Sequence, residues 1–482
     1  MMKTPSVIPL MIDGQDIVTP DGERQSEIAN GSHNGCPAVY QGATKALALQ
    51  TAKSSAKAYR IWSKTTPIER RRLLLNLAEV LRNRAEEIKQ VCCEEINCGP
   101  LWAEINVTDS IGLIEEYASL TTTAATGSIP FVQSGYGLVL KEPLGVVLGI
   151  APWNAPVILG LRAVVAPIAA GNVAILKGSE LSPKTHYLLA SMFRDAGFPP
   201  GVLNFLVHRP EDASEIFTSL ITHPAVKKCN FTGSTQVGRI IASQAAMALK
   251  PVLLELGGKN FTIVLDDADL DLAAGEIVKG AFLNNGQICM STDTVLVTKN
   301  VAQVLEGKIL SLLQKLDSTP VVISAAAKAK LQSLVTDAKE KGASVYIAPQ
   351  SSNPLPPHSY PATVVTGLTK EMVLYEVESF GPILGILTVE NEDAIMDIVQ
   401  ESKYGLSSSI ISQDHYRALE LARSIRAGAV HINSMTVHDE PTLPHGGHGD
   451  SGWGRFGAQW GLEEFVQTKV ITIHPGTARK LE

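Results

Sequence analysis

From residue 156 to residue 265, short apolar runs alternate with segments of helix length. The runs lie at 173–176, 202–206, 227–231 and 261–265, and the longer segments lie around 156–169, 183–196 and 234–248. Short apolar runs are typical of strands buried on both faces, and connections of helix length join parallel strands. The alternation therefore predicts an α/β fold in which crossover helices cover a parallel sheet.

A second alternation follows at roughly 269–432. Its strand candidates are the apolar runs at 294–297, 383–389, 407–411 and 430–432. A chain of 482 residues is also too long for one typical core. We therefore expect two α/β domains.

Three other segments carry local signals. Apolar positions at helical spacing within 43–98 predict a helical opening section, which stops at the Gly-Pro pair 99–100. The pattern within 136–150 predicts two strands joined by a tight turn. The Pro- and Ser-rich segment 348–361 predicts a loop.

Charge and composition exclude several classes of protein. The formal net charge is -7 and the pI is about 5.9, whereas proteins that bind a nucleic-acid backbone normally carry a basic patch. No stretch reaches the roughly 18 apolar residues of a membrane span. Residues 1–14 lack the regions of a secretory signal. We therefore expect no nucleic-acid partner, no membrane contact and a cytoplasmic location.

Cysteine and glutamate supply the first chemical candidates. Six cysteines are too few for a disulfide framework and lack paired metal-ligand spacing, so we expect reduced thiols and no metal. Cys289 follows small and polar residues rather than an apolar run, although a lone cysteine is more often a packing residue. Glu255 precedes Gly257 and Gly258, two glycines that let backbone approach closely. Alone, this glutamate could equally be an exposed charge at a strand end.

Six ordered motifs change that interpretation. They are APWN at 151–154, LKGSE at 176–180, FTGS at 231–234, ELGGK at 255–259, GQIC at 286–289 and ESFGP at 378–382. Together they resemble the aldehyde dehydrogenase superfamily, over nearly the whole chain from residue 11 to about 470. The resemblance implies the aldehyde dehydrogenase fold: a Rossmann-like NAD-binding domain, an α/β catalytic domain and a small β oligomerisation arm. The expected bounds are 1–120 and 143–254 for the NAD-binding domain, 255–455 for the catalytic domain, and 121–142 with 456–482 for the arm and C-terminal segment.

The resemblance implies covalent oxidation of an aldehyde to a carboxylic acid. Cys289 matches the nucleophile, which forms a thiohemiacetal and then a thioester. The Asn154 side chain and the Cys289 N–H would stabilise the oxyanion, and Glu255 matches the base that activates the hydrolytic water. The presence of Glu255 disfavours a CoA-acylating enzyme. Retention of all three residues disfavours a structural protein that kept the fold and lost its chemistry.

The resemblance also implies a nicotinamide cofactor. The expected cofactor residues are Ile150, Trp153, Lys177, Glu180, Gly233, Ser234, Gly238, Glu378 and Phe380. Gly233 and Ser234 follow a strand and open a helix, whose N–H groups would face the pyrophosphate. The carboxylate of Glu180 would repel a 2'-phosphate, so NAD is expected over NADP, which stays an alternative.

The substrate is expected to be a small aldehyde. Within the superfamily the chain looks most similar to salicylaldehyde, benzaldehyde and vanillin dehydrogenases. Trp102 matches a pocket tryptophan, Arg162 lies one helical stretch after Asn154, and the segment 437–440 also resembles that subgroup. The tryptophan would admit an aromatic ring, and Arg162 could bond an oxygen ortho to the aldehyde. Alternatively, Trp102 is core and Arg162 is a solvated helix residue. A non-aromatic aldehyde or a semialdehyde also stays open.

Two positions depart from the family pattern. His445 stands where most relatives have phenylalanine, and Gly449 stands where they commonly have lysine. The packing of this loop near the substrate is therefore left open.

Family members assemble through the segments matched here by about 121–142 and 465–475, so a homodimer or homotetramer is expected.

Overall fold

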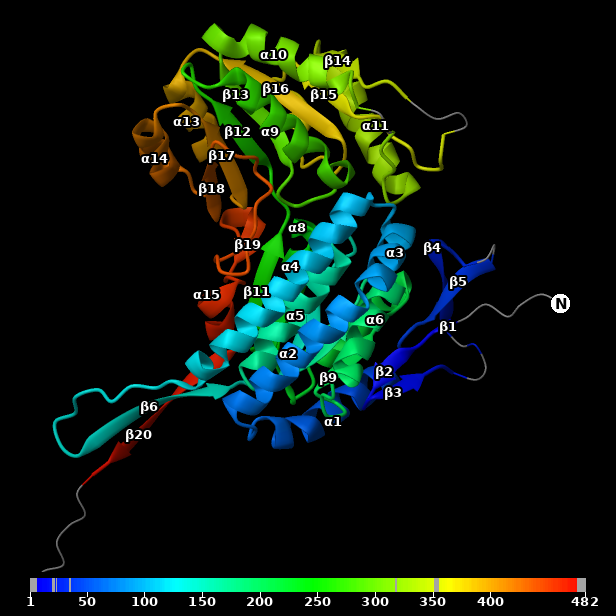
Figure 1. The fold of residues 1–482 in the computed structure, drawn as a ribbon, viewed down its shortest axis with the longest axis vertical. Coiled ribbons are helices and arrows are strands. Elements are labelled where there is room, and N and C mark those ends of the chain that lie inside the picture. The colour runs from blue at the N-terminus through cyan, green and yellow to red at the C-terminus, as the bar shows by residue number, and fades with distance from the viewer. Residues whose placement is uncertain are drawn as a thin grey trace, which may run out of the picture.

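The computed structural model describes residues 7–19, 22, 24–33, 36–316, 319–350 and 355–474. Two α/β bodies are stacked along the long axis of the molecule, and a two-stranded arm projects from the lower one (Figure 1). Each body has its own large sheet, so the predicted α/β fold with parallel strands and crossover helices is confirmed.

The lower body is built on an eight-stranded sheet with the strand order β19-β11-β10-β7-β8-β9-β2-β3. The five strands from β11 to β9 are parallel, and β19, β2 and β3 are antiparallel to their neighbours. The strands are β2 (Leu10–Ile12), β3 (Gln15–Ile17), β7 (Val146–Ile150), β8 (Val173–Lys177), β9 (Leu203–Leu206), β10 (Val226–Gly233), β11 (Val252–Leu256) and β19 (Gly452–Trp453). β7 is buried along its whole length, which explains its continuous apolar sequence.

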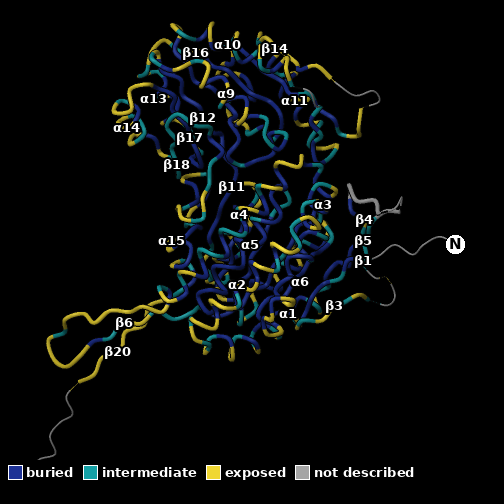
Figure 2. The backbone as a smooth tube through the Cα atoms, in the orientation of Figure 1, coloured by how far each residue is buried: buried dark blue, intermediate teal, exposed yellow. Residues whose placement is uncertain are grey.

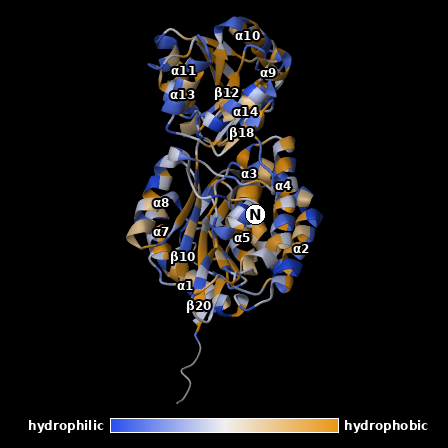
Figure 3. Cartoon of the chain, turned by 90° about the vertical axis from the view of Figure 1, so that its left-hand side faces the viewer, coloured by the Kyte–Doolittle hydropathy of each residue, from blue (hydrophilic) through white to orange (hydrophobic). Residues whose placement is uncertain are grey.

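Helices cover both faces of this sheet (Figure 3). The face with α1, α7 and α8 lies opposite the face with α5 and α6, and α2, α3 and α4 form a further layer over the latter. These helices are α1 (Lys45–Trp62), α2 (Pro67–Asn83), α3 (Ala85–Ile96), α4 (Pro100–Ser119), α5 (Pro156–Ala169), α6 (Pro183–Asp195), α7 (Ala213–Ile221) and α8 (Thr235–Met247). α5 is almost completely buried because the sheet and the outer helices enclose it, which explains why it is apolar around its circumference.

The upper body is built on a seven-stranded sheet with the order β14-β15-β16-β13-β12-β17-β18. All neighbours are parallel except β14 and β15. The strands are β12 (Asn260–Val264), β13 (Thr292–Thr298), β14 (Ser344–Ile347), β15 (Thr363–Thr366), β16 (Ile383–Val389), β17 (Ser407–Ile411) and β18 (Ala429–Ile432). The helices are α9 (Leu270–Phe282), α10 (Lys299–Leu313), α11 (Ala325–Glu340), α12 (Val373–Glu376), α13 (Glu392–Glu401) and α14 (His415–Ser424).

One predicted strand belongs to the other sheet. The run at 261–265, which we placed in the first alternation, forms β12 and pairs with β13 and β17 of the upper sheet. Apolar periodicity identifies a buried strand, but it does not identify the sheet that buries it. The remaining strand candidates are confirmed, those of the first alternation in the lower sheet and those of the second in the upper sheet.

The arm consists of two strands from distant parts of the chain. Both strands predicted within 136–150 are present, but they do not pair with each other. β6 (Tyr136–Pro143) leaves the body and pairs antiparallel with β20 (Val466–Ile473), whereas β7 enters the lower sheet. Most of the arm is exposed (Figure 2). The pairing of these two segments agrees with the expected arm, while its role in assembly stays a prediction.

The helical opening section is confirmed as α1, α2 and α3. α3 ends at Ile96 and Pro100 starts α4, so the Gly-Pro pair predicted as a stop also marks the next helix start. Of the predicted loop at 348–361, residues 348–350 and 355–361 are described, and they contain no helix or strand.

Smaller elements complete the described chain. A three-stranded sheet contains β1 (Val7–Ile8), β4 (Gln25–His33) and β5 (Cys36–Gln41). Short helices are η1 (Leu120–Ala125), η2 (Pro210–Asp212), η3 (Leu283–Gly286), η4 (Gly449–Ser451) and α15 (Ala458–Glu463).

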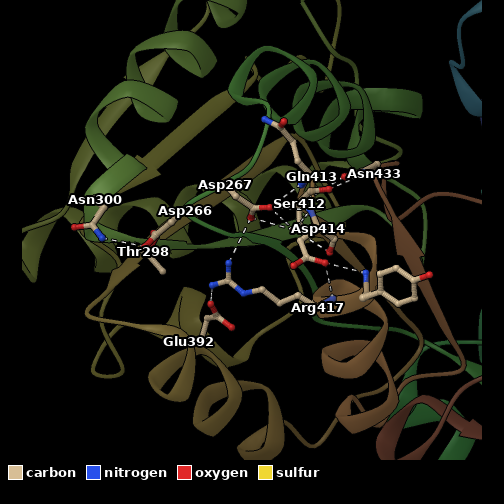
Figure 4. Close-up of polar contacts among 11 residues, drawn as sticks. Asp266, Asp267, Thr298, Asn300, Glu392, Ser412, Gln413, Asp414, Arg417 and Asn433 are labelled. Atoms are coloured by element: carbon tan, nitrogen blue, oxygen red, sulfur yellow. Dashed lines mark hydrogen bonds and ion pairs between the residues drawn. The ribbon is translucent and has the colours of Figure 1, made fainter.

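Polar side chains attach two helices to the carboxyl ends of two strands of the upper sheet (Figure 4). The carboxylate of Asp267, which follows β12, accepts the N–H groups of Gln413 at 2.9 Å and Asp414 at 2.8 Å beyond the end of β17. Asp414 in turn accepts two N–H groups in the first turn of α14 and so caps that helix. Arg417 pairs with Asp267 at 3.7 Å and with Glu392 of α13. These charge-assisted contacts link α13 and α14 to the ends of two strands.

The described ranges contain neither a candidate membrane span nor a candidate metal cluster. Among these residues, none of the helices combines the length and apolar character needed to cross a bilayer. In the same part of the chain, His, Cys, Asp and Glu form no group of three or more that could hold a metal ion. The cysteines with described side chains are free thiols, namely Cys92, Cys93, Cys98, Cys229 and Cys289.

A buried glutamate caps α6 from a neighbouring helix. Glu95 of α3 accepts the N–H groups of Lys184 at 2.7 Å and Thr185 at 2.8 Å. We expect Glu95→Ala to lower the free energy of unfolding by about 1–3 kcal/mol, because these buried N–H groups lose their acceptor. Urea unfolding at one fixed protein concentration measures the change.

The neighbouring glutamate provides a matched control. Glu94 faces the Lys184 ammonium at 4.0 Å with 44% of its side chain exposed, so Glu94→Ala should change the free energy of unfolding by no more than about 0.5 kcal/mol. Equal losses in the two variants would show that the Glu95 cap does not stabilise α6.

Candidate active site

Cys289 is presented by a tightly packed loop. Asn284, Asn285 and Gly286, within and at the end of η3, have φ values of 47°, 58° and 70°. Asparagine and glycine tolerate this left-handed conformation better than other residues. A Cβ on Gly286 would lie 2.2 Å from the carbonyl oxygen of Gly381, so only glycine fits there. The sequence before Cys289 therefore allows the loop to press against the segment that carries Phe380.

Asn260 holds the Cys289 loop from the other side. Its Nδ2 donates to the carbonyl oxygens of Cys289 at 2.8 Å and Ser291 at 2.9 Å, and its Oδ1 accepts the N–H of Ser407 at 3.2 Å. Asn260 is thus a positioning residue. The sequence analysis gave it no role, although it directly follows the ELGGK motif at 255–259.

Cys289, Glu255 and Asn154 come together at the end of the lower sheet. The Cys289 Sγ lies 3.4 Å from Oε1 of Glu255, which is on β11 and 1% exposed. Asn154 follows β7, and its Nδ2 donates to the carbonyl oxygen of Gln287 at 3.0 Å. The Asn154 carbonyl oxygen accepts from the Trp102 indole Nε1 at 2.8 Å. The three residues therefore lie together, and Trp102 fixes the backbone of one of them.

Two cavities meet at these three residues. One has a volume of about 240 Å³ and the other about 270 Å³, and Cys289, Glu255 and Asn154 line both. A reactive thiol between two cavities can meet one molecule from each side. The arrangement is therefore suited to a reaction between a substrate and a cofactor.

The first cavity has apolar walls and a charged end. The apolar side chains are those of Trp102, Ile105, Ile158, Leu159, Leu283, Ile288, Met290, Met435 and Val437. The charged or titratable side chains besides Cys289 and Glu255 are Asp109, Arg162, His438, Asp439 and His445. Its volume lies below the range of about 300–1,000 Å³ common for drug-sized ligands, which favours a small, largely apolar molecule.

Arg162 belongs to a buried cluster of charges. Its Nη1 lies 3.5 Å from Oε2 of Glu255, and its Nη2 pairs with Oδ2 of Asp439. His445 lies between the same carboxylates, with Nε2 3.2 Å from Glu255 Oε1 and Nδ1 3.6 Å from Asp439 Oδ1. We call Arg162, Glu255, Asp439 and His445 the charge ring. Arg162 is buried here and is not the solvated helix residue of the alternative interpretation.

Burial and the neighbouring charges have opposite effects on the pKa of Glu255, but burial and Glu255 act together on the pKa of Cys289. Burial alone would raise the pKa of Glu255, but the charge and hydrogen bond of His445 and the charge of Arg162 outweigh it and lower this pKa to about 2. Burial raises the pKa of the Cys289 thiol well above its ordinary value, and the neighbouring Glu255 carboxylate raises it further. At neutral pH the base is therefore ionised and the thiol is protonated.

The second cavity and a third one contain the expected cofactor residues. Trp153, Gly233, Ser234, Glu378 and Phe380 line the second cavity, where Phe380 meets Trp153 edge to face with ring centroids 5.9 Å apart. Ile150, Lys177 and Glu180 line a third, largely apolar cavity of about 410 Å³. Gly238 lines neither. It lies in α8, where a Cβ would be 2.5 Å from a methyl carbon of Leu256.

The residues fit a dinucleotide. α8 starts at Thr235 between the two cavities' lining residues, so its first N–H groups are available to a phosphate. Lys177 and Glu180 provide polar groups for a ribose beside apolar walls for a base. Burial raises the pKa of Glu378 to about 7, although its carboxylate accepts the N–H of Gly258 at 3.1 Å.

Some residues of this cavity were predicted from the sequence and others were not. Trp102 and Arg162 line the cavity together with Cys289, and their roles stay predictions. Asp439 and Asp109 were not predicted, and His445 was only a departure from the family pattern. Asp439 is 277 residues from Arg162, so no local spacing could connect them. The resemblance of the segment 437–440 to the aromatic-aldehyde subgroup was the available signal.

Comparison with known proteins gives a consistent result. Residues 17–471 match the model of the aldehyde dehydrogenase family. The chain is 39% identical to a vanillin dehydrogenase of Pseudomonas fluorescens, over 97% of this chain and 98% of that one. It is 38% identical to a salicylaldehyde dehydrogenase of Pseudomonas sp. strain C18, over 90% and 91% of the two chains. The crystal structure of a salicylaldehyde dehydrogenase from Pseudomonas putida G7 complexed with salicylaldehyde is similar, with a TM-score of 0.93, 34% identity, and coverage of 99% of this chain and 100% of that one.

The electrostatics of the thiol can be tested directly. In Glu255→Gln the negative charge beside Sγ is lost, so the pKa of Cys289 should fall and alkylation by iodoacetamide should begin at lower pH. Mass spectrometry of the Cys289 peptide across a range of pH measures the midpoint. Glu378→Gln is the matched control, because Glu378 raises the same pKa more weakly, and it should give a smaller downward shift. A midpoint that rises in Glu255→Gln would contradict this account.

Proposed function

This chain belongs to the aldehyde dehydrogenase family and is an oxidoreductase, and from that premise we propose that it oxidises a small aromatic aldehyde to its carboxylic acid through a thioester on Cys289. The observation that carries the proposal is the meeting of two cavities at Cys289, Glu255 and Asn154. The aldehyde enters from the cavity of about 240 Å³, and the cofactor enters from the opposite side.

Cys289 is the nucleophile in this proposal. Its Sγ lies between the cavities, and Glu255 Oε1 at 3.4 Å is the nearest base for its proton. Addition to the aldehyde carbon places an oxyanion near the Asn154 side chain. Asn154 Nδ2 would exchange its present acceptor, the carbonyl oxygen of Gln287, for that oxyanion.

The cofactor site accommodates NAD by the fit described above, and family members use NAD or NADP. When bound, the oxidised nicotinamide supplies the acceptor for the hydride of the substrate. Glu378 and Phe380 would hold its ribose and ring, and Lys177 the adenosine ribose. We propose NAD as the preferred form, because Glu180 puts a carboxylate where a 2'-phosphate would lie.

Glu255 completes the reaction as the base for hydrolysis. It is ionised at neutral pH and lines the cavities on both sides of the thiol. Once Glu255 has released the thiol proton to solvent, a water molecule attacking the thioester carbon gives its proton to this carboxylate. As the acid leaves, the departing thiolate takes that proton and the thiol is restored. A base beside the thioester favours transfer to water over transfer to CoA.

The walls of the substrate cavity support an aromatic aldehyde. Trp102 provides a flat apolar wall that is itself fixed by its hydrogen bond to Asn154. Arg162 lines the same cavity, but it already pairs with two carboxylates. Loss of Arg162 would unbalance the charge ring, so its removal should lower kcat/KM for all aldehydes and not only for those with an ortho oxygen.

The domain roles and the assembly are part of the same proposal. Residues 1–120 and 143–254 would bind NAD, and 255–455 would carry the thiol; the boundary between them lies inside β11. Pairing of β6 with β20 supports 121–142 and 456–482 as the arm of a homodimer or homotetramer.

An aldehyde panel tests the substrate. We expect NADH formation with benzaldehyde, salicylaldehyde and vanillin, higher kcat/KM with NAD than with NADP, and lower kcat/KM with short aliphatic aldehydes. Trp102→Leu should reduce kcat/KM for benzaldehyde roughly three- to tenfold through lost ring contact. The same variant should leave an aliphatic aldehyde within about twofold.

A second variant separates the ring of Trp102 from its hydrogen bond. Trp102→Phe keeps an aromatic wall but loses the donor to Asn154. If the wall selects the substrate, Trp102→Phe retains the preference for aromatic aldehydes. Equal losses for aromatic and aliphatic aldehydes in both variants would leave the family assignment standing without the aromatic pocket.

Pre-steady-state kinetics test the base. Glu255→Gln should release about one NADH per active site and then turn over slowly. Without the carboxylate the pKa of Cys289 falls, so the thiol still ionises by losing its proton to solvent and forms the thioester, which is then not hydrolysed. Stopped-flow absorbance measures both phases. The double variant with Cys289→Ala should give no first phase, and an unchanged steady rate in Glu255→Gln would remove Glu255 from the mechanism.

A further inference from the structure

His445 lies between two carboxylates in a buried place. Its Nε2 is 3.2 Å from Glu255 Oε1, its Nδ1 is 3.6 Å from Asp439 Oδ1, and its side chain is 8% exposed. The backbone is fixed as well, because His445 and Phe456 exchange two backbone hydrogen bonds of 2.9 and 2.8 Å. The imidazole therefore cannot easily turn away from either carboxylate.

This arrangement selects one protonation state of the ring. A neutral imidazole has one donor and one acceptor nitrogen, whereas an ionised carboxylate only accepts. A neutral His445 would point a lone pair at one of the two carboxylates, whereas an imidazolium donates to Glu255 and forms an ion pair with Asp439. The net charge of the charge ring also favours the imidazolium. Glu255, Asp439 and Arg162 sum to one negative charge, which an imidazolium cancels, and buried charges are normally paired.

The titratable groups that face the His445 imidazole from other elements are consistent with the imidazolium. Burial and the charge of Asp439 together raise the pKa of Asp109 on α4 to about 6. Burial lowers the pKa of His431 on β18 to about 4, and the charges of His438 and His445 add to that effect. The titratable or charged groups around His445 are Asp109, Arg162, Glu255, Cys289, His431, His438, Asp439 and Glu440.

We propose that His445 is a positioning residue for the hydrolytic base: as an imidazolium clamped by Asp439, it keeps Glu255 ionised and turned toward Cys289. The inference rests on the function proposed for Glu255. Oε1 is shared between His445 and the thiol, and Oε2 is held by the Thr232 hydroxyl at 3.1 Å and by Arg162. A phenylalanine at this position could supply neither the charge nor the donors.

The sign of the effect follows from the opposing influences on Glu255. Without the imidazolium, burial is opposed only by Arg162 and by hydrogen bonds, so the pKa of Glu255 rises. The carboxyl group is then protonated at a higher pH than in the wild type, and below that pH it cannot accept a proton from water. The acid side of the kcat profile should therefore move to higher pH by about one unit or more.

Two variants separate charge from hydrogen bonding. His445→Gln keeps a donor for Glu255 without the charge, and His445→Phe removes both. We expect the acid limb of kcat to shift upward in both, and further in His445→Phe. Asp439→Asn, which leaves His445 in place, should shift the limb in the same direction by a smaller amount.

The matched control is His448→Gln. His448 lies three residues further along the same loop, its Nε2 accepts from Arg455 Nη2 at 3.0 Å, and it lines neither of the two cavities that meet at Cys289, so this variant should keep the acid limb of the wild type. A fault in packing would lower kcat at every pH without moving the limb. That result, or a wild-type limb in both His445 variants, would overturn the proposal.

The charge of His445 can also be measured without turnover. In protein labelled with ¹⁵N-histidine, the signals missing from His445→Gln identify this ring. Two protonated nitrogens at neutral pH are expected, and one protonated with one unprotonated nitrogen would overturn the proposal. Because the spectrum needs no aldehyde or cofactor, it separates failure of this inference from failure of the proposed function.

Discussion

The chain passes from one sheet to the other in only three residues, 257–259, between β11 and β12. This short crossing places Glu255, near the end of a lower strand, beside the Cys289 loop that leads into an upper strand. It also explains the two glycines, because a Cβ on Gly257 would lie 2.4 Å from a carboxylate oxygen of Glu378. Lys259 anchors the crossing through a buried ion pair with Asp293 at 2.6 Å. The base, the thiol and a cofactor-cavity residue therefore share one rigid connection.

The resting site keeps its two reacting groups in opposite protonation states. Glu255 is buried yet ionised, because His445 and Arg162 outweigh the cost of burial, whereas Cys289 is protonated because burial and Glu255 act together. A protonated thiol next to an ionised base is protected from unwanted reactions with electrophiles. Activation then requires only a transfer across the 3.4 Å between Sγ and Oε1.

Sequence could predict the parts of the site that short motifs encode. Cys289, Glu255 and Asn154 each lie in a motif whose neighbours restrict the backbone, as the left-handed Asn284 to Gly286 illustrate. The partners of those residues could not be predicted, because Asp439 reaches Arg162 only through the tertiary fold. The same reason explains the error at 261–265: a buried strand looks alike in either sheet. The fold class depended on alternation along the chain, which sequence displays directly.

The arm imposes an order on biosynthesis. Lys469 of β20 pairs with Glu142 of β6, and the two residues are 327 positions apart. A nascent chain therefore displays β6 long before its partner strand has been translated, and all the strands of the lower sheet, including β11 and β19, are translated while that edge is still open. Unpaired edges with apolar side chains such as Leu140 invite pairing with other chains. β20, the last strand within the described residues, is thus the one that closes this edge.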